Sequence, residues 1–458
     1  MSIDQAVSLG QAANTGQAAN LGQAANTGQA ASLGQAVDTG QAVSTARAVS
    51  LGPTVGAGPT GSTAAPGDRL PSGARLLRGE RNWWFLGPGG VARLGGRHVT
   101  ADGTLRPEAE QRLRESGMFT PPRDRAYALT VLTSTHCNLG CGYCFQNTAQ
   151  DAAGGSRPPR IARTRLTSET ITSVLGFTRR QMAAVGLDEL RILLFGGEPL
   201  LNPRGCLELL ERSADIARTS AWMISNATLL TPALARRLAE LGLTSVQVTF
   251  DGDRADHDRI RIGRADGSGT FDKIIGNIVK ASEVSPLRWT LRVNVSQETF
   301  HGVDALIDRL AGALDPARCT LYFARIGDVG VGYANSLLHT GELAAAFTRW
   351  QRRALGLGFT VSRPGARKTC VTCGHTDGRY GAVVSADGTL ASCWETAGKP
   401  DWEVGTVTDG YLPGAATRDR WIACQDLYRY DEDALTLARF RDTVDTALLD
   451  HLDETGRL

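Results

Sequence analysis

Residues 126–147 read AYALTVLTSTHCNLGCGYCFQN, an apolar run followed at once by a loop with three thiols. The thiols belong to Cys137, Cys141 and Cys144, at spacings of four and three residues. Three thiols cannot all pair as disulfides, and a closed tetrahedral zinc site needs four ligands. The loop therefore predicts a metal group held by three cysteines with one position open, unless His136 completes a zinc knuckle.

The bulk composition narrows the class of protein. The chain has 458 residues, 42% of them hydrophobic, which gives room for two or three domains. Lys+Arg 49 and Asp+Glu 47 nearly balance, so no basic stripe predicts nucleic-acid binding. Runs such as RILLF are too short to cross a membrane, and MSIDQAVSLG lacks the features of a secretory signal. We expect a cytoplasmic protein, and its nine cysteines favour metal binding over a disulfide framework.

The first 66 residues differ from the rest of the chain. Glycines at positions 10, 16, 22, 28, 34 and 40 mark a six-residue repeat such as GQAANT, and residues 1–66 contain no aromatic residue. A left-handed β-helix and an appended peptide substrate or recognition tail are two interpretations of this repeat. We favour a third, a disordered low-complexity tail and linker that cannot bury enough surface to fold.

Three further segments flank the predicted catalytic unit. Residues 67–123 form an N-terminal extension, in which RNWWFLGPGGVARL predicts two strands and LRPEAEQRLRESG a short helix. Residues 331–365 predict a helical connection. Residues 431–458 place apolar residues at helical spacing, which predicts a C-terminal packing helix, with partner binding as the alternative.

Residues 124–330 alternate between strand and helix patterns. The predicted strands are AYALTVLTS (126–134), LRILLF (190–195), WMISN (222–226), SVQVTF (245–250), WTLRVNV (289–295) and TLYFARI (320–326). The predicted helices are 168–186, 204–218, 231–242, 271–284 and 302–314. Six such units with continuous apolar strands predict an α/β fold with a parallel sheet, a partial (β/α)6 TIM-like barrel. Chemistry in such folds gathers at the carboxyl ends of the strands, where the cysteine loop lies.

The cysteine spacing, with Tyr143 before the last thiol, resembles the signature of the radical S-adenosylmethionine superfamily. In that family three cysteines bind a [4Fe-4S] cluster and leave one iron free for S-adenosylmethionine (AdoMet). The resemblance implies both cofactors, with Tyr143 at the cofactor site. It also implies that AdoMet is cleaved to a 5′-deoxyadenosyl radical, which removes a hydrogen atom from the substrate.

Later motifs extend this resemblance along the strands. Phe195 to Pro199 read FGGEP, similar to the family's GGEP motif, which implies AdoMet contacts at Gly196, Gly197, Glu198 and Pro199. Glu198 would accept a hydrogen bond from the methionine ammonium. Residues 225–230 read SNATLL and resemble a family stretch near the ribose and methionine, which implies contacts from Ser225 and Asn226, with an alanine where the family has glycine.

The fourth and fifth strands carry weaker parts of the resemblance. Residues 249–252 read TFDG, similar to a run in the peptide- and protein-modifying subgroup, which implies cofactor contacts from Thr249 and Asp251. On the fifth strand, residues 292–294 read RVN and are also similar to family sequences, which implies a cofactor contact from Arg292. The pair His257-Asp258 that follows is either catalytic or a local helix cap.

A second group of cysteines lies in residues 366–430. The pattern Cys373-x14-Gly388-x4-Cys393 resembles the opening of the SPASM and twitch extensions, in which a hairpin carries ligands for an auxiliary cluster. The resemblance implies one auxiliary [4Fe-4S] cluster held by Cys370, Cys373, Cys393 and Cys424. A four-cysteine structural zinc site is the alternative. Cys206 and Cys319 are expected to be ordinary buried thiols.

The resemblance favours a peptide maturase that oxidatively modifies a ribosomally made precursor peptide. The products in such relatives include C–C and C–S crosslinks and cyclopropane-type rings. A flavodoxin or ferredoxin would supply electrons, and no nucleic acid or membrane partner is expected. A radical dehydrogenase of a small molecule such as an amino sugar, a sulfatase-type maturase and a non-enzymatic zinc-binding scaffold remain as alternatives. No residue can be assigned as catalytic base from the sequence.

Overall fold

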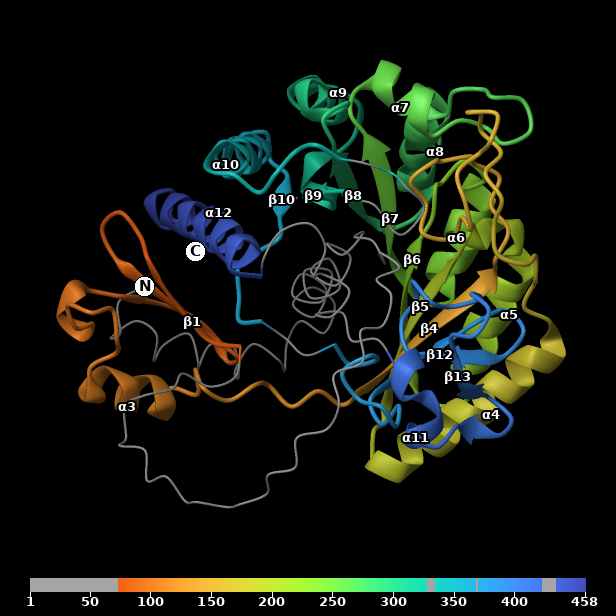
Figure 1. Cartoon of the computed structure of the whole chain (residues 1–458), viewed down its shortest axis with the longest axis horizontal. Coiled ribbons are helices and arrows are strands. Elements are labelled where there is room, and N and C mark those ends of the chain that lie inside the picture. The colour runs from red at the N-terminus through yellow and green to blue at the C-terminus, as the bar shows by residue number, and fades with distance from the viewer. Residues whose placement is uncertain (1–72, 328–332, 334, 368–369, 422–433) are drawn as a thin grey trace, which may run out of the picture.

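The computed structural model describes residues 73–327, 333, 335–367, 370–421 and 434–458. The repeat segment 1–66 and Cys424 lie outside the described residues. The described chain forms one 11-stranded sheet, in the order β10-β9-β8-β7-β6-β5-β4-β11-β12-β13-β14, and a separate three-stranded sheet, β1-β2-β3 (Figure 1).

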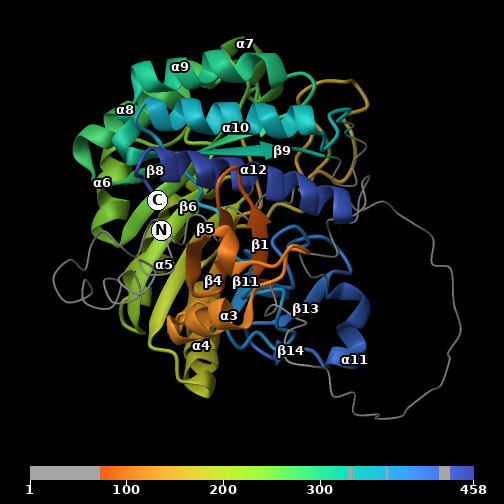
Figure 2. The ribbon, with the colours of Figure 1, turned by 90° about the vertical axis from the view of Figure 1, so that its left-hand side faces the viewer.

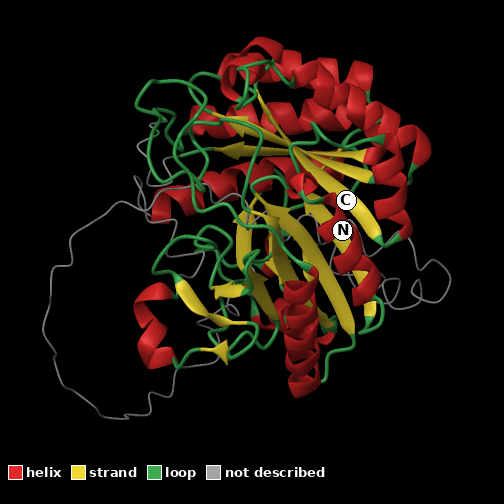
Figure 3. Ribbon diagram, turned by 90° about the vertical axis from the view of Figure 1, so that its right-hand side faces the viewer, coloured by secondary structure: helices red, strands yellow, loops and turns green. Residues whose placement is uncertain are grey.

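Six parallel strands form the centre of the large sheet. They are β4 (Ala126–Ser134), β5 (Glu189–Gly196), β6 (Arg218–Ile224), β7 (Leu243–Asp251), β8 (Arg288–Val295) and β9 (Cys319–Arg325). The connecting helices are α4 (Ser168–Val185), α5 (Pro203–Ser213), α6 (Pro232–Glu240), α7 (Arg254–Ile260), α8 (Phe271–Val284) and α9 (Val303–Ala313). These helices cover one face of the sheet (Figure 3). The predicted α/β fold with a parallel sheet is confirmed.

One predicted helix boundary is wrong. The second connecting helix was expected to run from residue 204 to 218, but α5 ends at Ser213 and β6 begins at Arg218. Thr219 donates from its side chain to the carbonyls of Ser213 (3.2 Å) and Ala217 (3.0 Å), which ties this turn together. Residues 214–217 therefore form a connection between α5 and β6 rather than a helical turn.

The expectation of continuous apolar strands holds for β5 but not for β7 and β8. On β7, Val246, Val248 and Phe250 pack in the main core beneath the helices. Side chains alternate between faces along a strand, so Thr249 and Asp251 face the other way. The strand sequences VQVTFD and LRVNV thus combine an apolar helix-facing side with a polar inner side.

The inner face of the sheet, opposite the helices, therefore has two halves. An apolar half on β4 to β6 consists of Leu132, Leu193, Phe195, Trp222 and Ile224. A polar half on β7 and β8 consists of Gln247, Thr249, Asp251, Thr290, Arg292 and Asn294. The main core on the helix-facing side is apolar along all six strands.

The C-terminal segment continues the same sheet. Strand β11 (Gly381–Val384) pairs in parallel with β4, and β12 (Thr389–Ala391) pairs antiparallel with β11. A hairpin, as the Cys373-x14-Gly388-x4-Cys393 pattern implied, is therefore present at the edge of the barrel strands. The last strands, β13 (Glu403–Thr406) and β14 (Gly410–Tyr411), extend it, and β10 (Thr360–Val361) lies at the opposite edge.

The N-terminal extension is a small unit with its own core. It contains β1 (Arg75–Arg78), β2 (Trp83–Gly87), β3 (Gly90–Leu94) and α3 (Pro107–Glu115). The long helix α12 (Ala434–Glu454) packs on α10 (Gly341–Gly356) and approaches β1 (Figure 2).

Hydrogen bonds join α12 to the N-terminal strands. The indole Nε1 of buried Trp84 donates to Asp450 (2.7 Å), and Arg75 pairs with Asp442 (2.8 Å) and Asp445 (2.5 Å). Helix α12, which the helical spacing of apolar residues in 431–458 predicted, thus packs against other parts of the same chain. No helix among the described residues has both the length and the apolar character of a membrane span.

Shorter helical elements complete the connections. They are η2 (Gly96–His98), η3 (Pro199–Leu201), η4 (Phe300–Gly302), η5 (Pro316–Arg318), α11 (Gly414–Thr417) and η6 (Arg418–Arg420).

Candidate active site at the carboxyl ends of the strands

The three-cysteine loop follows β4 at the carboxyl edge of the sheet. Cys137 and Cys141 are buried and Cys144 is half-buried, and all three are free thiols that cluster with Leu139 and Tyr143. Burial raises the pKa of Cys141 to about 12, so this thiol needs a nearby positive charge or a bound metal to ionise. Among the described residues, no three His, Cys, Asp or Glu side chains converge as ligands of a single ion would. A cubane cluster takes each thiolate on a different iron, so such convergence is not required.

The two glycines of FGGEP lie directly against the start of this loop. Gly197 N donates to Ser134 O (2.8 Å) and Glu198 N to His136 O (2.8 Å). A Cβ on Gly197 would lie 2.5 Å from His136 O, and Gly196 has a φ of 138°. Glycine is required at both positions because the two loops share backbone hydrogen bonds at contact distance.

The Glu198 carboxylate links the second and third strands. It accepts from Leu200 N (2.9 Å), Ser225 Oγ (2.7 Å) and Asn226 N (2.7 Å). Burial raises the pKa of Glu198, and these hydrogen bonds oppose that rise. Three donors occupy three of about four acceptor positions of a carboxylate, so one position remains for a further donor. Pro199 is buried and begins η3 beside this carboxylate.

Asn226 reaches from the end of β6 back to the cysteine loop. Its Nδ2 donates to Asn138 Oδ1 (2.9 Å) and lies 3.8 Å from Cys137 Sγ. The next residue, Ala227, is buried with a φ of 58°, the left-handed region that alanine rarely adopts. Asn277 Nδ2 donates to its carbonyl (2.8 Å) and holds this turn. The alanine is therefore accommodated in a backbone conformation that favours glycine.

Tyr143 connects the cysteine loop to the polar half. Its hydroxyl donates to Asp251 Oδ2 (2.8 Å) and accepts from Arg261 Nη1 (2.7 Å) and Asn294 Nδ2 (2.9 Å). Burial raises the pKa of Asp251, and the positive charge of Arg261 opposes the rise. Asp251 Oδ1 has no hydrogen-bond partner among the described residues, although the Asn294 amide is near enough to lower the carboxyl pKa. This buried oxygen can accept from a bound ligand.

Arg292 and Thr249 lie beside this network. Arg292 Nε donates to Asn294 Oδ1 (2.8 Å), and its guanidinium lies 5.6 Å from the centre of the Tyr322 ring. Thr249 is half-buried and pairs in register with Arg292 on the neighbouring strand. Both side chains belong to the polar half.

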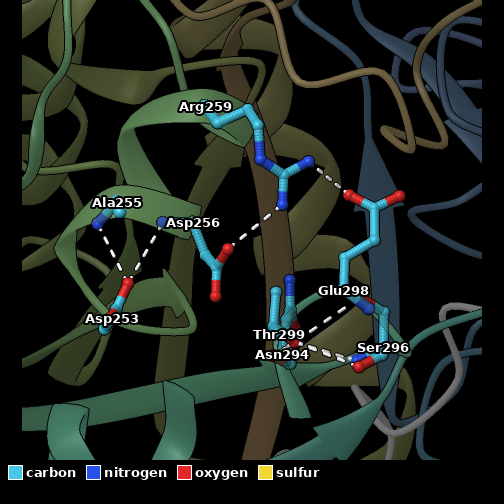
Figure 4. Close-up of polar contacts among 8 residues, drawn as sticks. All are labelled: Asp253, Ala255, Asp256, Arg259, Asn294, Ser296, Glu298 and Thr299. Atoms are coloured by element: carbon cyan, nitrogen blue, oxygen red, sulfur yellow. Dashed lines mark hydrogen bonds and ion pairs between the residues drawn. The ribbon is translucent and has the colours of Figure 1, made fainter. Parts of the chain in front are cut away.

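Local hydrogen bonds fix the segments that carry Arg261 and Asn294 (Figure 4). The Asp253 side chain caps α7, and Arg259 pairs with Glu298 (2.5 Å) in the loop after β8. Thr299 Oγ1 donates to Asn294 O (3.1 Å). The end of β8 and helix α7 are thus joined near the site.

The pair His257-Asp258 has structural contacts. His257 is buried, its Nε2 lies 3.2 Å from Thr270 Oγ1, and burial holds its pKa well below the usual value, so the ring is neutral. Asp258 Oδ1 accepts from Thr270 N (2.7 Å) and Phe271 N (2.8 Å) at the start of α8. Of the two interpretations, the geometry fits the helix cap.

Arg160 is a neighbour of the thiols that the sequence motifs did not reveal. Its Nη1 lies 3.4 Å from Cys144 Sγ and its Nη2 donates to Gln146 Oε1 (2.8 Å). Burial lowers the pKa of Arg160, but the thiols of Cys144, Cys137 and Cys141 raise it by more, so the pKa lies above its usual value. A guanidinium in this place would counter the negative charge of ligated thiolates. The signal available in the sequence is the run of four arginines at 157, 160, 163 and 165.

The described cysteines of the second group lie around the C-terminal hairpin. Cys373 and Cys393 are buried, and Cys370 is half-buried. Trp421 Nε1 donates to Cys373 O (3.0 Å), and Ser392 Oγ donates to Arg420 O (3.1 Å). The CVTC turn and the hairpin end therefore meet at residues 420–421, three positions before Cys424.

A row of aromatic rings joins the two cysteine groups. The Phe145 ring, after Cys144, stacks on Phe195 at 6.1 Å, and Phe195 lies 5.7 Å from Trp394, after Cys393. The segment after Trp394 also approaches the loop, since a Cβ on Gly398 would lie 3.0 Å from Ile161 Cδ1. The two cysteine groups therefore lie near each other, with side chains of the apolar half between them.

The chain matches a family model and several known proteins. Residues 131–310 match the family described as Radical SAM superfamily. The Fe-coproporphyrin III synthase of Methanosarcina barkeri (strain Fusaro / DSM 804) is 24% identical over 238 residues, which are 52% of this chain and 54% of that protein. The chain thus spans about half the length of this curated relative.

Two solved structures share the fold. Native anSMEcpe with bound AdoMet has a TM-score of 0.55 and 16% identity, over 72% of this chain and 100% of that one. Native anSMEcpe with bound AdoMet and Kp18Cys peptide has a TM-score of 0.54 and 16% identity, over 73% and 100%.

Proposed function

We infer that this chain, whose place in the radical SAM superfamily the family match supports, is a peptide maturase. It would cleave AdoMet reductively and oxidatively modify a ribosomally made precursor peptide. The proposal has three parts, namely a cluster and AdoMet site, an auxiliary cluster and a peptide substrate.

The first part concerns the loop after β4. Cys137, Cys141 and Cys144 would hold the [4Fe-4S] cluster, and the free acceptor position of Glu198 would receive the AdoMet ammonium. When bound together, the cluster and AdoMet supply the one-electron cleavage that yields a 5′-deoxyadenosyl radical. Glu198 and Asn226 would orient the methionine end. The polar half would bind the remaining polar groups, and burial of the loop would exclude water.

The second part concerns the C-terminal cysteines, which carry the oxidative assignment. Cys393 lies at the end of a hairpin that extends the barrel sheet, and Cys370 and Cys373 lie in a turn whose Cys373 O accepts from Trp421 Nε1 (3.0 Å). Cys424 would supply the fourth thiolate. Four thiolates would hold one auxiliary [4Fe-4S] cluster and leave no iron for a substrate. Because rings from Phe145 to Trp394 join the two groups, this cluster would be placed to accept an electron from a substrate radical.

The third part concerns the substrate. Trp222 of the apolar half and the neighbouring Phe145 and Trp394 are only partly buried. They offer aromatic surface to an apolar side chain of a peptide, while the polar half can pair with its backbone groups. That a protein of this fold holds AdoMet together with a peptide brings a peptide into the proposal.

The proposal is tested with two cysteine variants of the reconstituted protein. Cys393→Ser should retain AdoMet cleavage to 5′-deoxyadenosine and lose modification of a precursor peptide encoded beside the gene. Cys206→Ser is the matched control, because Cys206 is buried in α5 with its thiol 3.4 Å from Pro199 O, a contact that serine can keep. The control should retain both activities. Full peptide turnover by Cys393→Ser would contradict the auxiliary role.

A small-molecule substrate is the second candidate. The name of the curated relative, Fe-coproporphyrin III synthase, is the observation that favours it. Deuterium transfer distinguishes the two, since the hydrogen removed from the substrate appears in 5′-deoxyadenosine. Transfer from a deuterated peptide supports the maturase. Transfer from a porphyrin alone supports the second candidate.

A further inference from the structure

A basic segment borders the three-cysteine loop. Residues 136–168 contain four arginines, at 157, 160, 163 and 165, and Asp151 is their single acidic residue. Arg157, Arg163 and Arg165 are exposed, whereas Arg160 turns inward to Cys144. Arg157, Arg163 and Arg165 together form the arginine surface.

The segment that carries the arginine surface runs alongside the cysteine loop. Bridges pair Asn147 with Arg160 and Ser134 with Arg165, both antiparallel, and Thr148 N donates to Pro159 O (2.8 Å). Figure 1 shows this stretch, after β4, beside the loop between α7 and α8 at the edge of the molecule. Arg163 lies between the two bridges, so the surface is held against the outer side of the loop.

The arginine surface is not neutralised by the chain itself. Arg157 donates to the backbone carbonyls of Arg264 (3.1 Å) and Ala265 (2.8 Å), which fix it without cancelling its charge. In the described part of the chain, no carboxylate forms an ion pair with Arg157, Arg163 or Arg165. Arginines on the helices do form such pairs, as between Arg353 and Asp308 (2.6 Å). The surface therefore keeps its positive charge.

The arginine surface also lies close to the thiols. Arg160, between Arg157 and Arg163 in the chain, has its Nη1 3.4 Å from Cys144 Sγ, and a bridge joins Arg165 to Ser134, three residues before Cys137. A partner seated on the arginine surface would thus sit next to the three thiols.

We propose that Arg157, Arg163 and Arg165 form the docking surface for an acidic protein that donates single electrons. The inference rests on the proposed function, because the electron acceptor is the cluster held by Cys137, Cys141 and Cys144. The donor is oxidised by one electron and the cluster is reduced by one, with no proton transferred and no bond formed. An acidic donor fits because opposite charges speed association and fix its orientation.

A precursor peptide with an acidic leader would also meet this charge. The placement favours the electron donor, because the arginine surface lies outside the cysteine loop while Trp222 and Trp394 lie on the inner face of the sheet. A peptide must reach the inner face, whereas an electron donor needs only to approach the cluster.

The test is the double charge reversal Arg163→Glu/Arg165→Glu in the reconstituted full chain. Cluster reduction is followed by the loss of its visible absorbance, with reduced flavodoxin or with dithionite and without any substrate. The flavodoxin rate at low salt should fall about 10- to 100-fold. The dithionite rate should change less than about twofold, since a small reductant needs no docking surface. Salt should slow the flavodoxin reaction of the wild type and not that of the variant.

A matched control carries the same charge change elsewhere. Arg179→Glu/Arg236→Glu changes exposed arginines on α4 and α6, helices that return towards the amino ends of the strands. It should keep the wild-type flavodoxin rate.

Equal effects of the two double variants would overturn the inference. So would an unchanged flavodoxin rate in Arg163→Glu/Arg165→Glu together with weaker peptide binding, which would make this a peptide surface. A wild-type preparation that binds no iron would overturn the proposed function as well, so the two failures are distinguishable.

Discussion

The two halves of the inner face lie on neighbouring strands but are held together by different interactions, apolar packing in one and hydrogen bonds among polar and charged groups in the other. The apolar half packs Leu132, Leu193 and Phe195 against the C-terminal hairpin, and its contacts are non-directional. In the polar half, Asp251 forms a buried hydrogen-bonded network with Arg261 and Tyr143, which depends on direction and charge.

This difference separates two tasks of the site. The apolar half lies between the two cysteine groups, where close packing without charge would place two redox groups near each other. The polar half contacts Tyr143 of the cysteine loop through Asp251 and Asn294. It also retains a carboxylate oxygen, Asp251 Oδ1, with no hydrogen-bond partner among the described residues. A polar ligand is therefore expected on the β7–β8 side and an apolar substrate group on the β5–β6 side.

The largest expected effect is at Arg261, which pairs with Asp251 of the polar half. Arg261→Met should lower the free energy of unfolding by about 3–5 kcal/mol, because it leaves Asp251 buried without its cation. Chemical denaturation followed by circular dichroism measures this loss. Arg261→Met/Asp251→Leu should recover most of it, and a double variant as unstable as the single one would contradict the role of charge.

The same variant should show a distinctive pH dependence. Without Arg261 the pKa of Asp251, already raised by burial, should rise further above its value in the unfolded chain. The folded state then binds the proton more tightly than the unfolded state, so acid favours folding at this site. The stability deficit of Arg261→Met should narrow as the pH falls from 7 towards 4. A constant deficit would contradict this account.

A truncation in the apolar half should cost somewhat less and behave differently. Leu193 is fully buried on the inner face, so Leu193→Ala should lower the free energy of unfolding by about 3 kcal/mol through lost burial and a cavity. This deficit should stay the same between pH 7 and 4. A marked pH dependence would show that the two halves are not distinct.

Gly197 tests the contact between the FGGEP motif and the cysteine loop. Its substitution by alanine places a Cβ 2.6 Å from the carbonyl carbon of His136, so the loop must shift. Gly197→Ala should cost about 1–3 kcal/mol and lower iron binding after reconstitution. The control Gly312→Ala, in α9 with no atom within 4 Å of the new Cβ, should leave iron binding unchanged. Wild-type iron content in Gly197→Ala would contradict the need for glycine at this contact.

The smallest effect is expected at Ala227. Because its φ is 58°, Ala227→Gly should raise the free energy of unfolding by about 1 kcal/mol. The same substitution at Ala235, inside α6, should lower it by about 1 kcal/mol. Equal signs at the two positions would contradict the backbone argument.

Much of the fold could be predicted from local patterns. Strand β4 has the predicted bounds, Ala126–Ser134, because an uninterrupted apolar run ends where the cysteine loop begins. The polar side of β7 and β8 was visible as a two-residue alternation in VQVTFD and LRVNV, although continuous apolar strands were expected. In these two strands a two-residue alternation therefore indicates which side chains face the helices and which face inward.

Long-range contacts could not be predicted in this way. Strand β11 pairs with β4 across about 250 positions, and no local signal specifies that pairing. Arg160 approaches Cys144 because the segment folds back at Asn147, a bridge fixed only by the tertiary structure. The assignments of the cofactor-binding residues and of the two clusters stay predictions.

The central claim, two clusters on one sheet, is tested most directly by the iron and sulfide content after anaerobic reconstitution. The wild type is compared with Cys137→Ala/Cys141→Ala/Cys144→Ala. The account predicts a fall from about eight irons per chain to about four, as two cubane clusters require. Four irons falling to none, with zinc retained, would contradict the auxiliary cluster, and an unchanged iron content would contradict the assignment of the three-cysteine loop.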